Sequence, residues 1–394
     1  MKIHRIAVVV SHPIQHFCPQ YSSWASLPGV ELRVFFASKY GLKPYEDSGF
    51  GRTIQWPGIE LDFPHEFLPA AEGRTLDTNI DSAQLNVSLV SFSPDVLIVY
   101  GYSQRLQRRA LRWAEKNQIP VFMLSDSELR SFRSLLKRAV KALTLPRWYR
   151  SVRLFLTVGD ANEAYYRNYG VTDDRLIRCF FPIDIKYYDS IVANRHDCRK
   201  RIRDKLGIPM HHKVILMVGK LVYWKRQMDL ILFSNANHDV YDDVTVVLVG
   251  TGPEEARLHG LAKRIGAGGV IFAGFVSPDI LAEFYCAADV YAHCSDHEPH
   301  SLAISEAIYC GLPVVLSDRC GSYGPSDDVR QGLNGYIYPC GEIYDMSRCL
   351  KRIFDDAESY SRMCDASQRI GRQHQALAHG IALTQAISVI DLNC

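Results

Sequence analysis

Two glutamates eight positions apart, Glu298 and Glu306, lie in a stretch whose neighbours could complete a ligand site. Pro299 follows the first glutamate, an apolar-periodic segment leads to Gly311, and a short apolar run comes next. The pattern predicts a loop with Glu298, a helix with Glu306, and then a buried strand. Carboxylates accept hydrogen bonds from hydroxyl groups, so we expect a ligand that carries several hydroxyls, such as a ribose or a hexose.

The start of this predicted helix could also bind an anion. A helix that begins after Pro299 leaves the N–H groups of Ser301, Leu302 and Ala303 without intrahelical acceptors. Free amides and the helix dipole together favour a phosphate at such a position. The stretch therefore combines the groups that a sugar phosphate or a nucleotide requires.

A second group of candidates lies in the first half of the chain. The apolar run 6–10 predicts a central parallel strand, and the loop after it contains His12, Gln15 and His16. Open α/β sheets bind ligands at this end of their strands. These side chains either face a cleft as sugar or acceptor contacts, with His16 as a catalytic candidate, or only pack locally. Asp126, which follows the predicted strand 120–124, is a further cleft candidate.

Buried strands alternate with helices along the whole chain, which predicts an α/β fold. The length of 394 residues and a composition of 47% hydrophobic and 22% charged residues favour two domains. We expect a first domain at 1–184, a second at 185–370, and a final helical segment at 371–394 that could pack back on the first domain. The long aromatic-rich insertion 39–80 is either a functional loop or a small satellite core.

The charge and cysteine patterns limit the possible classes. The net charge is +2, which does not indicate binding of polyanions by the whole molecule. The eleven cysteines include no CxxC pair and favour reduced thiols in a cytoplasmic protein without a disulfide framework. The first apolar run is too short for a signal peptide, and no run approaches the length of a spanning helix.

One segment could contact a membrane. Residues 129–153 contain eight basic and no acidic residues, interleaved with apolar ones at helical spacing. Such a helix can lie on an anionic membrane surface, which would place the protein peripherally on the inner face of the membrane. The alternative is a soluble amphipathic helix with a solvated basic face. No nucleic-acid motif accompanies the run, so no nucleic acid is expected.

The stretch around Glu298 resembles the signature of retaining glycosyltransferases of family 4, which have the GT-B fold. The family form is E-P-F-G-L, then E-A, then G-x-P-V-V, and this chain departs from it at His300 and Ser301. The resemblance implies two doubly wound Rossmann-like domains that face a central cleft. The matching residues are Glu298, Pro299, Leu302, Glu306, Ala307, Gly311, Pro313, Val314 and Val315.

Further matches lie in the second domain. Gly219, Lys220 and Lys225 resemble the family's G-R-L followed by K-G, although Lys220 replaces an arginine. Gly252 lies in a segment close to G-x-G-P-E, and the segment with Phe275 and Val276 resembles the one whose backbone meets the nucleotide base.

The resemblance implies a role for each group. The two lysines would hold the donor diphosphate, since fixed cations stabilise a leaving phosphate without a metal. Glu306 would bind the ribose. Glu298, with His300, Ser301 and Leu302, would bind the donor sugar. No metal or other cofactor is expected.

The resemblance implies a hexosyltransferase that moves a sugar, most simply from a UDP-sugar, to a glycan or lipid-linked acceptor in surface polysaccharide or glycoconjugate synthesis. Because the first domain offers no credible nucleophile, retention favours a same-face displacement over a covalent intermediate. A nucleotide-sugar epimerase and a non-catalytic nucleotide-sugar-binding subunit remain as alternatives. A periplasmic binding protein is disfavoured by the missing export signal, and a dehydrogenase by the absence of G-x-G-x-x-G after the first strand.

Overall fold

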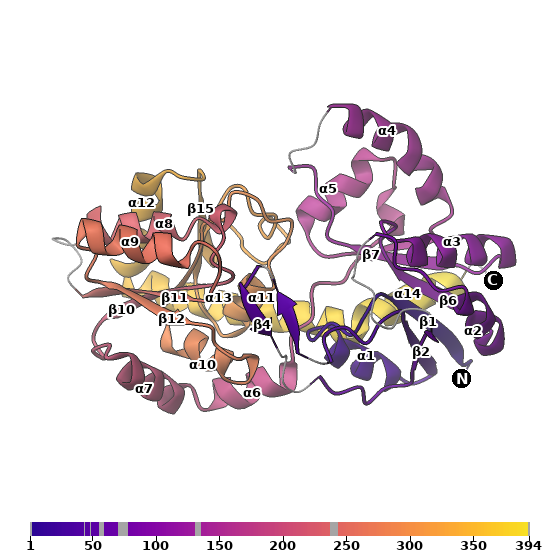
Figure 1. Ribbon diagram of the computed structural model, residues 1–394, viewed down its shortest axis with the longest axis horizontal. Coiled ribbons are helices and arrows are strands. Elements are labelled where there is room, and N and C mark those ends of the chain that lie inside the picture. Colours follow the sequence, from indigo (N-terminus) through magenta and orange to yellow (C-terminus); the bar gives the residue numbers. More distant parts are fainter. Residues whose placement is uncertain are drawn as a thin grey trace. The chain divides into compact units, whose positions relative to one another are not determined.

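A computed structural model describes residues 2–42, 44–47, 49–54, 59–69, 78–130, 135–236 and 243–392. The chain divides into two compact units. The first domain contains residues 1–45, 58–184 and 374–394, and the second contains 46–57 and 185–373. Each domain is built on one parallel sheet with helices packed against it, so the predicted α/β fold with two doubly wound domains is confirmed (Figure 1).

The first domain has a seven-stranded sheet in the order β5-β2-β1-β6-β7-β8-β9. The continuous apolar runs of the sequence form its central strands, as expected for parallel strands covered on both faces. The strands are β1 (His4–Val10), β2 (Val30–Phe36), β5 (His65–Phe67), β6 (Val96–Tyr100), β7 (Val121–Ser125), β8 (Leu154–Thr157) and β9 (Leu176–Arg178). The helices are α1 (Cys18–Ala25), α2 (Gln84–Phe92), α3 (Arg105–Asn117), α4 (Leu135–Arg150), α5 (Asp160–Asn168) and α14 (Ala382–Asp391), with a 3-10 turn at Asp173–Arg175.

The strand order of this sheet reverses between β1 and β6, because β1 pairs with both β2 and β6. At such a switch point the two following connections leave to opposite faces and open a crevice at the carboxyl ends of the strands. The loop with His12, Gln15 and His16 follows β1, and Gly101 follows β6. The loop with the predicted cleft residues of the first domain therefore follows a strand at the switch point, and its role in ligand binding stays a prediction.

The second domain has a six-stranded sheet in the order β12-β11-β10-β13-β14-β15. Its strands are β10 (Lys213–Val218), β11 (Val244–Val249), β12 (Val270–Gly274), β13 (Val290–His293), β14 (Val314–Ser317) and β15 (Gly335–Tyr338). Its helices are α6 (Ile185–Ala193), α7 (Arg195–Leu206), α8 (Met228–Ala236), α9 (Glu255–Ile265), α10 (Pro278–Ala287), α11 (Leu302–Tyr309), α12 (Ile343–Phe354) and α13 (Ala357–Ala376), with a 3-10 turn at Tyr223–Lys225.

The switch point of this second sheet lies between β10 and β13, since β10 pairs with β11 on one side and β13 on the other. The loop with Lys220 and Lys225 leaves β10, and the loop with Glu298 leaves β13. The topology alone thus brings the predicted cations and the predicted carboxylate to one crevice.

A short segment from the first half of the sequence, residues 46–57, belongs to the second domain. It contains β3 (Tyr45–Asp47) and β4 (Arg52–Ile54), which pair with each other in a two-stranded sheet. We call the described residues 46–54 the arm. Trp56, one of the aromatic residues of the predicted insertion, lies outside the described residues.

The final segment, which the sequence predicts as helical from residue 371, is helical up to Asp391. After α13 a π-helical turn (Leu377–Ile381) leads directly into α14. Ala382, Leu383 and Ala386 of α14 are fully buried in the core of the first domain, beside strand residues such as Ile6 and Val8.

The basic segment 129–153 is helical over Leu135–Arg150, which is α4. Leu145 and Tyr149 are buried in the core of the first domain, whereas Val140 and Leu143 are 50% and 71% exposed. The predicted split into an apolar and a solvent-facing side is therefore present, but apolar residues lie on both sides. Arg133 lies outside the described residues. In the described part of the chain, no helix is both long and apolar enough to cross a membrane.

Candidate active site

The loop, helix and strand that the sequence predicts around Glu298 are confirmed. The loop leaves β13, α11 starts at Leu302 with Ser301 as its N-cap, and β14 follows at Val314. One detail of the expected anion site is wrong. The amide of Ser301 donates to the Oγ atom of the buried Ser322 at 2.9 Å, so it is not free. Among the described residues, the amides of Leu302 and Ala303 have no such acceptor and remain available to an anion.

Three donors converge on one oxygen of Glu298. Its Oε2 atom accepts hydrogen bonds from Lys225 Nζ, from His293 Nε2 at 3.0 Å and from Ser295 Oγ at 3.1 Å. Burial alone would raise the pKa of Glu298, but the charge of Lys225 and the contact with His293 hold it far below its usual range. Within the described chain Oε1 has no protein partner. The cluster therefore fixes an ionised carboxylate by one oxygen and leaves the other for a ligand hydroxyl.

His293 is fully buried and contacts a second polar side chain, Tyr291, besides Glu298. Its Nδ1 atom lies 3.2 Å from the hydroxyl of Tyr291, while Nε2 faces Glu298. Burial lowers the pKa of His293 despite the nearby carboxylate, so the ring is neutral at neutral pH. A neutral ring suits both contacts when Nε2–H donates to Glu298 and the unprotonated Nδ1 faces the hydroxyl of Tyr291, whose hydrogen is shared with the carbonyl of Val218 at 3.3 Å. We infer this tautomer from the hydrogen bonds.

Replacing His293 by Leu removes the donor to Glu298 and is expected to raise the pKa of that carboxyl group. In the role that the resemblance implies for Glu298 the carboxylate is ionised. Activity should then disappear at a higher pH on the acid side, and kcat should fall about tenfold, as for one lost hydrogen bond to a charged group. The pH dependence of kcat measures both effects. His293→Gln, which can still donate from Nε2, should restore most of the wild-type profile. Identical acid limbs in the Leu variant and the wild type would contradict this role.

Lys225 lies over Gly219, at the end of β10. A Cβ atom placed on Gly219 would be 3.8 Å from Lys225 Cε, so the lysine runs across the glycine toward Glu298. The next strand end packs equally closely. A Cβ atom on Gly250 would lie 2.0 Å from the Gly219 carbonyl, and one on Gly252 would lie 2.4 Å from the Leu221 carbonyl. Only glycine fits at these two positions, and the loops after β10 and β11 therefore form one continuous backbone edge.

Lys220 belongs to the same edge but has a different partner. Its Nζ atom contacts both carboxylate oxygens of Asp47 in the arm, at 2.9 and 3.0 Å, and lies over the ring of Phe50. Burial opposes the effect, but this lysine lowers the pKa of Asp47. Phe50 in turn packs edge-on against Phe275 at 5.6 Å. The sequence predicts the same role for Lys220 and Lys225. In the structure Lys220 pairs with Asp47 and Lys225 with Glu298.

The arm reaches the predicted base-binding segment as well. The carbonyl of Phe50 accepts a hydrogen bond from Thr251 Oγ1 at 3.2 Å, next to Gly252. Val276, which follows Phe275 in the connection from β12 to α10, is half-buried. The arm therefore lies along the carboxyl ends of β10, β11 and β12 inside the second domain.

Glu306 lies on α11 and faces two tyrosines. Its carboxylate accepts a hydrogen bond from Tyr285 Oη at 2.7 Å, and the hydroxyl of Tyr188 is a second donor. Burial raises the pKa of Glu306 to about 7, although both tyrosines act in the opposite direction. Glu298 and Glu306 thus have opposite pKa shifts: the pKa of Glu298 lies far below its usual range, whereas that of Glu306 lies near neutral pH.

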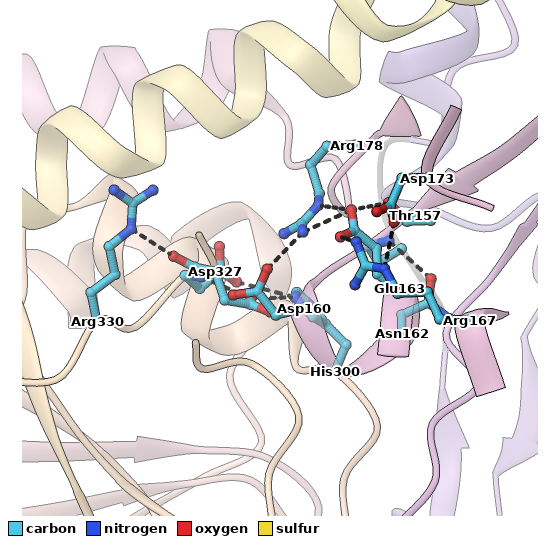
Figure 2. Close-up of polar contacts among 12 residues, drawn as sticks. Thr157, Asp160, Asn162, Glu163, Arg167, Asp173, Arg178, His300, Asp327 and Arg330 are labelled. Atoms are coloured by element: carbon cyan, nitrogen blue, oxygen red, sulfur yellow. Dashed lines mark hydrogen bonds and ion pairs between the residues drawn. The ribbon is translucent and has the colours of Figure 1, made fainter. Parts of the chain in front are cut away.

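The imidazole of His300 lies inside the domain. The side chain is 1% exposed, and its Nε2 atom is 3.4 Å from Asp327 and 3.5 Å from Asp328, both fully buried. Figure 2 shows His300 beside Asp327, whose backbone carbonyl accepts from Arg330. Ser305 on α11 donates to Asp328 at 2.8 Å. The sequence predicts His300 as a contact of the donor sugar. In the structure its ring lies beside the two buried aspartates, Asp327 and Asp328.

The candidates of the first domain form two aromatic contacts. His12 accepts or donates to Ser11 Oγ at 2.9 Å and packs edge-on against Tyr40, and the ring of His16 lies against Phe17 at 4.4 Å. Burial lowers the pKa of both histidines to about 4. The rings are therefore neutral, which suits His16 as a proton acceptor or a packing residue. Gln15 is half-buried, and Asp126 is exposed after β7.

A polar network that the sequence did not indicate lies at the same sheet edge of the first domain. Arg178, at the end of β9, contacts Asp160 at 2.7 Å and Glu163 at 2.8 Å, and Thr157 Oγ1 donates to Glu163 (Figure 2). The side chains come from the ends of two neighbouring strands and from the first turn of α5. These contacts tie the ends of β8 and β9 to the first turn of α5.

The sequence interpretation also missed the residues that hold Glu298. Tyr291, His293 and Ser295 alternate along β13 and the first residues after it, so their side chains share one face. Three polar residues at a spacing of two, ending three positions before Glu298, were the available signal. Asp47 gave no signal, because its contact with Lys220 joins residues 173 positions apart.

Comparison with known proteins finds a sequence family whose model matches part of the second domain. Residues 199–369 match the family described as "Glycosyl transferases group 1". A lipopolysaccharide core biosynthesis glycosyltransferase, LpsE of Rhizobium meliloti, is 34% identical over 164 residues, which cover 41% of this chain and 46% of that protein. A D-inositol 3-phosphate glycosyltransferase of Acidothermus cellulolyticus is 36% identical over 149 residues, 35% of this chain and 32% of that protein. The chain thus covers less than half of each relative's length.

The structural likeness extends over the whole chain. HepE of Anabaena, solved in complex with UDP, superposes with a TM-score of 0.70 over 99% of this chain and 100% of its own, at 19% sequence identity. WaaG, a glycosyltransferase involved in lipopolysaccharide biosynthesis, gives a TM-score of 0.59 over 98% of this chain and 99% of its own, at 16% identity. At these identities the comparison shows the fold, which is the predicted GT-B fold.

Proposed function

We propose that this protein is a retaining glycosyltransferase of family 4 that moves a hexosyl group from a UDP-sugar to a glycan or lipid-linked acceptor in surface polysaccharide or glycoconjugate synthesis. The observation that supports it most is the Glu298 cluster at the switch point of the second sheet. The match to glycosyltransferases over residues 199–369 covers this cluster. The UDP bound to HepE favours a uridine nucleotide as the donor's base.

The reaction would be a displacement on one face of the sugar. The bond from the anomeric carbon to the diphosphate oxygen breaks, and a bond to the acceptor oxygen forms on the same face. The acceptor proton passes to a departing phosphate oxygen, so no protein nucleophile is required. Lys225 and the amides of Leu302 and Ala303 would stabilise the negative charge that develops on the diphosphate. Glu298 Oε1 would accept from a sugar hydroxyl and favour positive charge on the ring.

Direct assay of donor consumption tests this proposal. The protein is incubated with a panel of nucleotide sugars, with and without a mixture of membrane glycan acceptors. A transferase releases nucleoside diphosphate, and faster with acceptor. Conversion of the nucleotide sugar into an isomer would indicate the epimerase, and tight binding without turnover would indicate the non-catalytic subunit. A chelator should leave the rate unchanged. Loss of the rate with chelator would instead point to a cation at His300, Asp327 and Asp328, whose side chains could hold one.

The pKa of Glu306 predicts a proton linkage. Ribose hydroxyls that donate to Glu306 favour its ionised form, so nucleotide binding should release a proton below pH 7. Affinity should then rise with pH by up to about tenfold per unit until about pH 7. Titration calorimetry in two buffers of different ionisation enthalpy measures the released proton. Glu306→Gln should remove this part of the pH dependence, and an unchanged dependence would contradict the assignment of Glu306 to the ribose.

The same shift affects stability without ligand. The folded state keeps the proton of Glu306 up to about pH 7, whereas the unfolded chain loses it near 4.5. Because the folded state binds more protons in this window, the contribution of Glu306 to stability is present below pH 4.5 and declines as the pH rises to 7.

Contact with a membrane remains part of the proposal. The exposed Val140 and Leu143 of α4, together with the exposed Arg147 and Arg150, would suit the interface of an anionic bilayer. A peripheral position of this kind would bring the protein to lipid-linked acceptors.

A further inference from the structure

A groove in the first domain contains an excess of positive charge that the proposed reaction does not use. It has a volume of about 630 Å³ and lies between α2 and α3, which pack side by side (Figure 1). Its lining includes five cations, Arg105, Arg108, Arg109, Arg112 and Lys116, and a single carboxylate, Asp81. All five cations come from α3, at helical positions that face the groove.

Two of these cations are held in place by the protein. Both oxygens of Asp81 accept from Arg109, at 2.7 and 2.6 Å, and this arginine lowers the pKa of Asp81. Arg108 donates to the carbonyl of Tyr102 at 3.1 Å and to that of Ser103 at 2.5 Å. Their guanidinium groups are therefore oriented before any ligand arrives, which lowers the entropy lost on binding.

Arg105 acts on Asp81 only through its charge, which also lowers the pKa of that carboxyl group, and the other two cations have no acidic partner in the part of the chain that the structure describes. Arg105, Arg112 and Lys116 form no ion pair there, although Glu115 lies on the same helix outside the groove. Like charges along one face of a helix repel one another, and an anion in the groove would relieve this repulsion. Arginines also match phosphate with two parallel hydrogen bonds.

The position of the groove relates it to the ligand edge of the first domain. Arg105 is the first residue of α3, which follows β6, and β6 borders the switch point of the sheet. From Arg105 to Lys116 the helix extends roughly 16 Å at 1.5 Å per residue. A molecule whose reacting end lies at the switch point could therefore place an anionic chain along α3.

We propose that this groove binds the phosphate groups of a phosphorylated saccharide acceptor. That the bound saccharide is an acceptor rests on the proposed function. That it carries phosphate rests on the cations of the groove. A concave site suits a discrete chain better than the broad surface of a bilayer. Trp113 and Val90, which also line the groove, supply apolar walls for sugar rings.

The test uses the full chain and a variant that lacks the three unpaired cations, Arg105→Gln, Arg112→Gln and Lys116→Gln. All three side chains are exposed or at the rim, so the fold should be kept. The matched control removes three exposed cations of the second domain, Lys263→Gln, Arg264→Gln and Lys351→Gln. The probes are glucose 1,6-bisphosphate, glucose, and vesicles of phosphatidylglycerol and phosphatidylcholine.

We expect calorimetry to show binding of glucose 1,6-bisphosphate, and none of glucose, by the wild type and the control variant. The groove variant should bind the bisphosphate at least about tenfold more weakly. Lys225→Ala should bind it as the wild type does, which separates this site from the donor site. Equal affinity of the groove variant and the wild type, or no binding by the wild type, overturns the proposal.

Vesicle sedimentation distinguishes binding of a phosphorylated saccharide in the groove from contact of this surface with a membrane. If the groove variant loses vesicle binding while its affinity for glucose 1,6-bisphosphate is unchanged, the surface contacts lipid and the proposal fails. Both measurements are independent of turnover. If the wild type binds glucose 1,6-bisphosphate in the groove but consumes no donor, only the proposed function is contradicted. If it consumes donor but does not bind the bisphosphate, only this inference is contradicted.

Discussion

Glu298→Gln is expected to lower kcat by about 10²- to 10³-fold, the usual effect of removing one group that stabilises transition-state charge. The amide keeps the volume of the side chain but loses the negative charge that we propose faces the sugar ring. It also presents an NH₂ group to surroundings that contain the donors Lys225, His293 and Ser295. Donors facing donors would reorient the side chain and disturb the free oxygen. Initial rates of donor consumption and of sugar transfer measure the loss.

Glu358→Gln is the matched control, because Glu358 is 84% exposed on α13 and lies in the same domain. It should leave the rate and the unfolding temperature unchanged. The Glu298 variant should unfold cooperatively, so that a lower rate is not a consequence of lost structure. A Glu298→Gln protein with wild-type kcat would remove this carboxylate from the mechanism.

Lys225→Ala is expected to reduce kcat/KM by about 10³-fold, or about 4 kcal/mol of transition-state stabilisation. Its ammonium group would face the departing diphosphate, and in the structure it also neutralises the buried Glu298. Removal leaves a largely buried carboxylate without its cation, which raises the pKa of Glu298 as well. The same rate assays over a pH series separate the two consequences.

Lys220→Ala is the informative comparison. This lysine is 37% exposed and already paired with Asp47, so its charge is less available to a ligand. We expect a loss of less than about tenfold, as for an exposed ion pair. Lys263→Ala on the exposed face of α9 should have no effect. Equal losses for Lys220 and Lys225 would contradict the distinction that the structure makes.

Local patterns were sufficient for the elements and for part of the site. Most strands were predicted, because a parallel strand covered on both faces is a continuous apolar run and this signal lies within a few residues. The edge strand β5 (His65–Phe67) was missed, since it is short and lies in the segment 39–80 that the sequence predicts as an insertion. Glu298 and Lys225 meet because their loops follow β13 and β10, the two strands at the switch point. The order of strands in the sheet determines that these two loops are neighbours. The resemblance to the glycosyltransferase family supplied this strand order.

Contacts between distant segments were not predictable in the same way. Ser322 captures the amide of Ser301, and Asp47 pairs with Lys220, through chain segments whose sequence gives no indication of their destination. The imidazole of His300 was expected at the ligand because of its place in the motif, but two buried aspartates compete for it. A motif fixes the path of the backbone more reliably than the direction of a side chain that departs from the motif.

Because of the arm, the second domain is formed by two separate segments of the chain. A chimera in which the C-terminal half of a relative replaces everything after Asp184 would keep this protein's Asp47 and Phe50 but receive foreign partners at positions 220, 251 and 275. If the second domain binds the sugar nucleotide as proposed, such a chimera would contain an incomplete binding unit. Moving residues 46–54 together with the C-terminal half should yield the better hybrids.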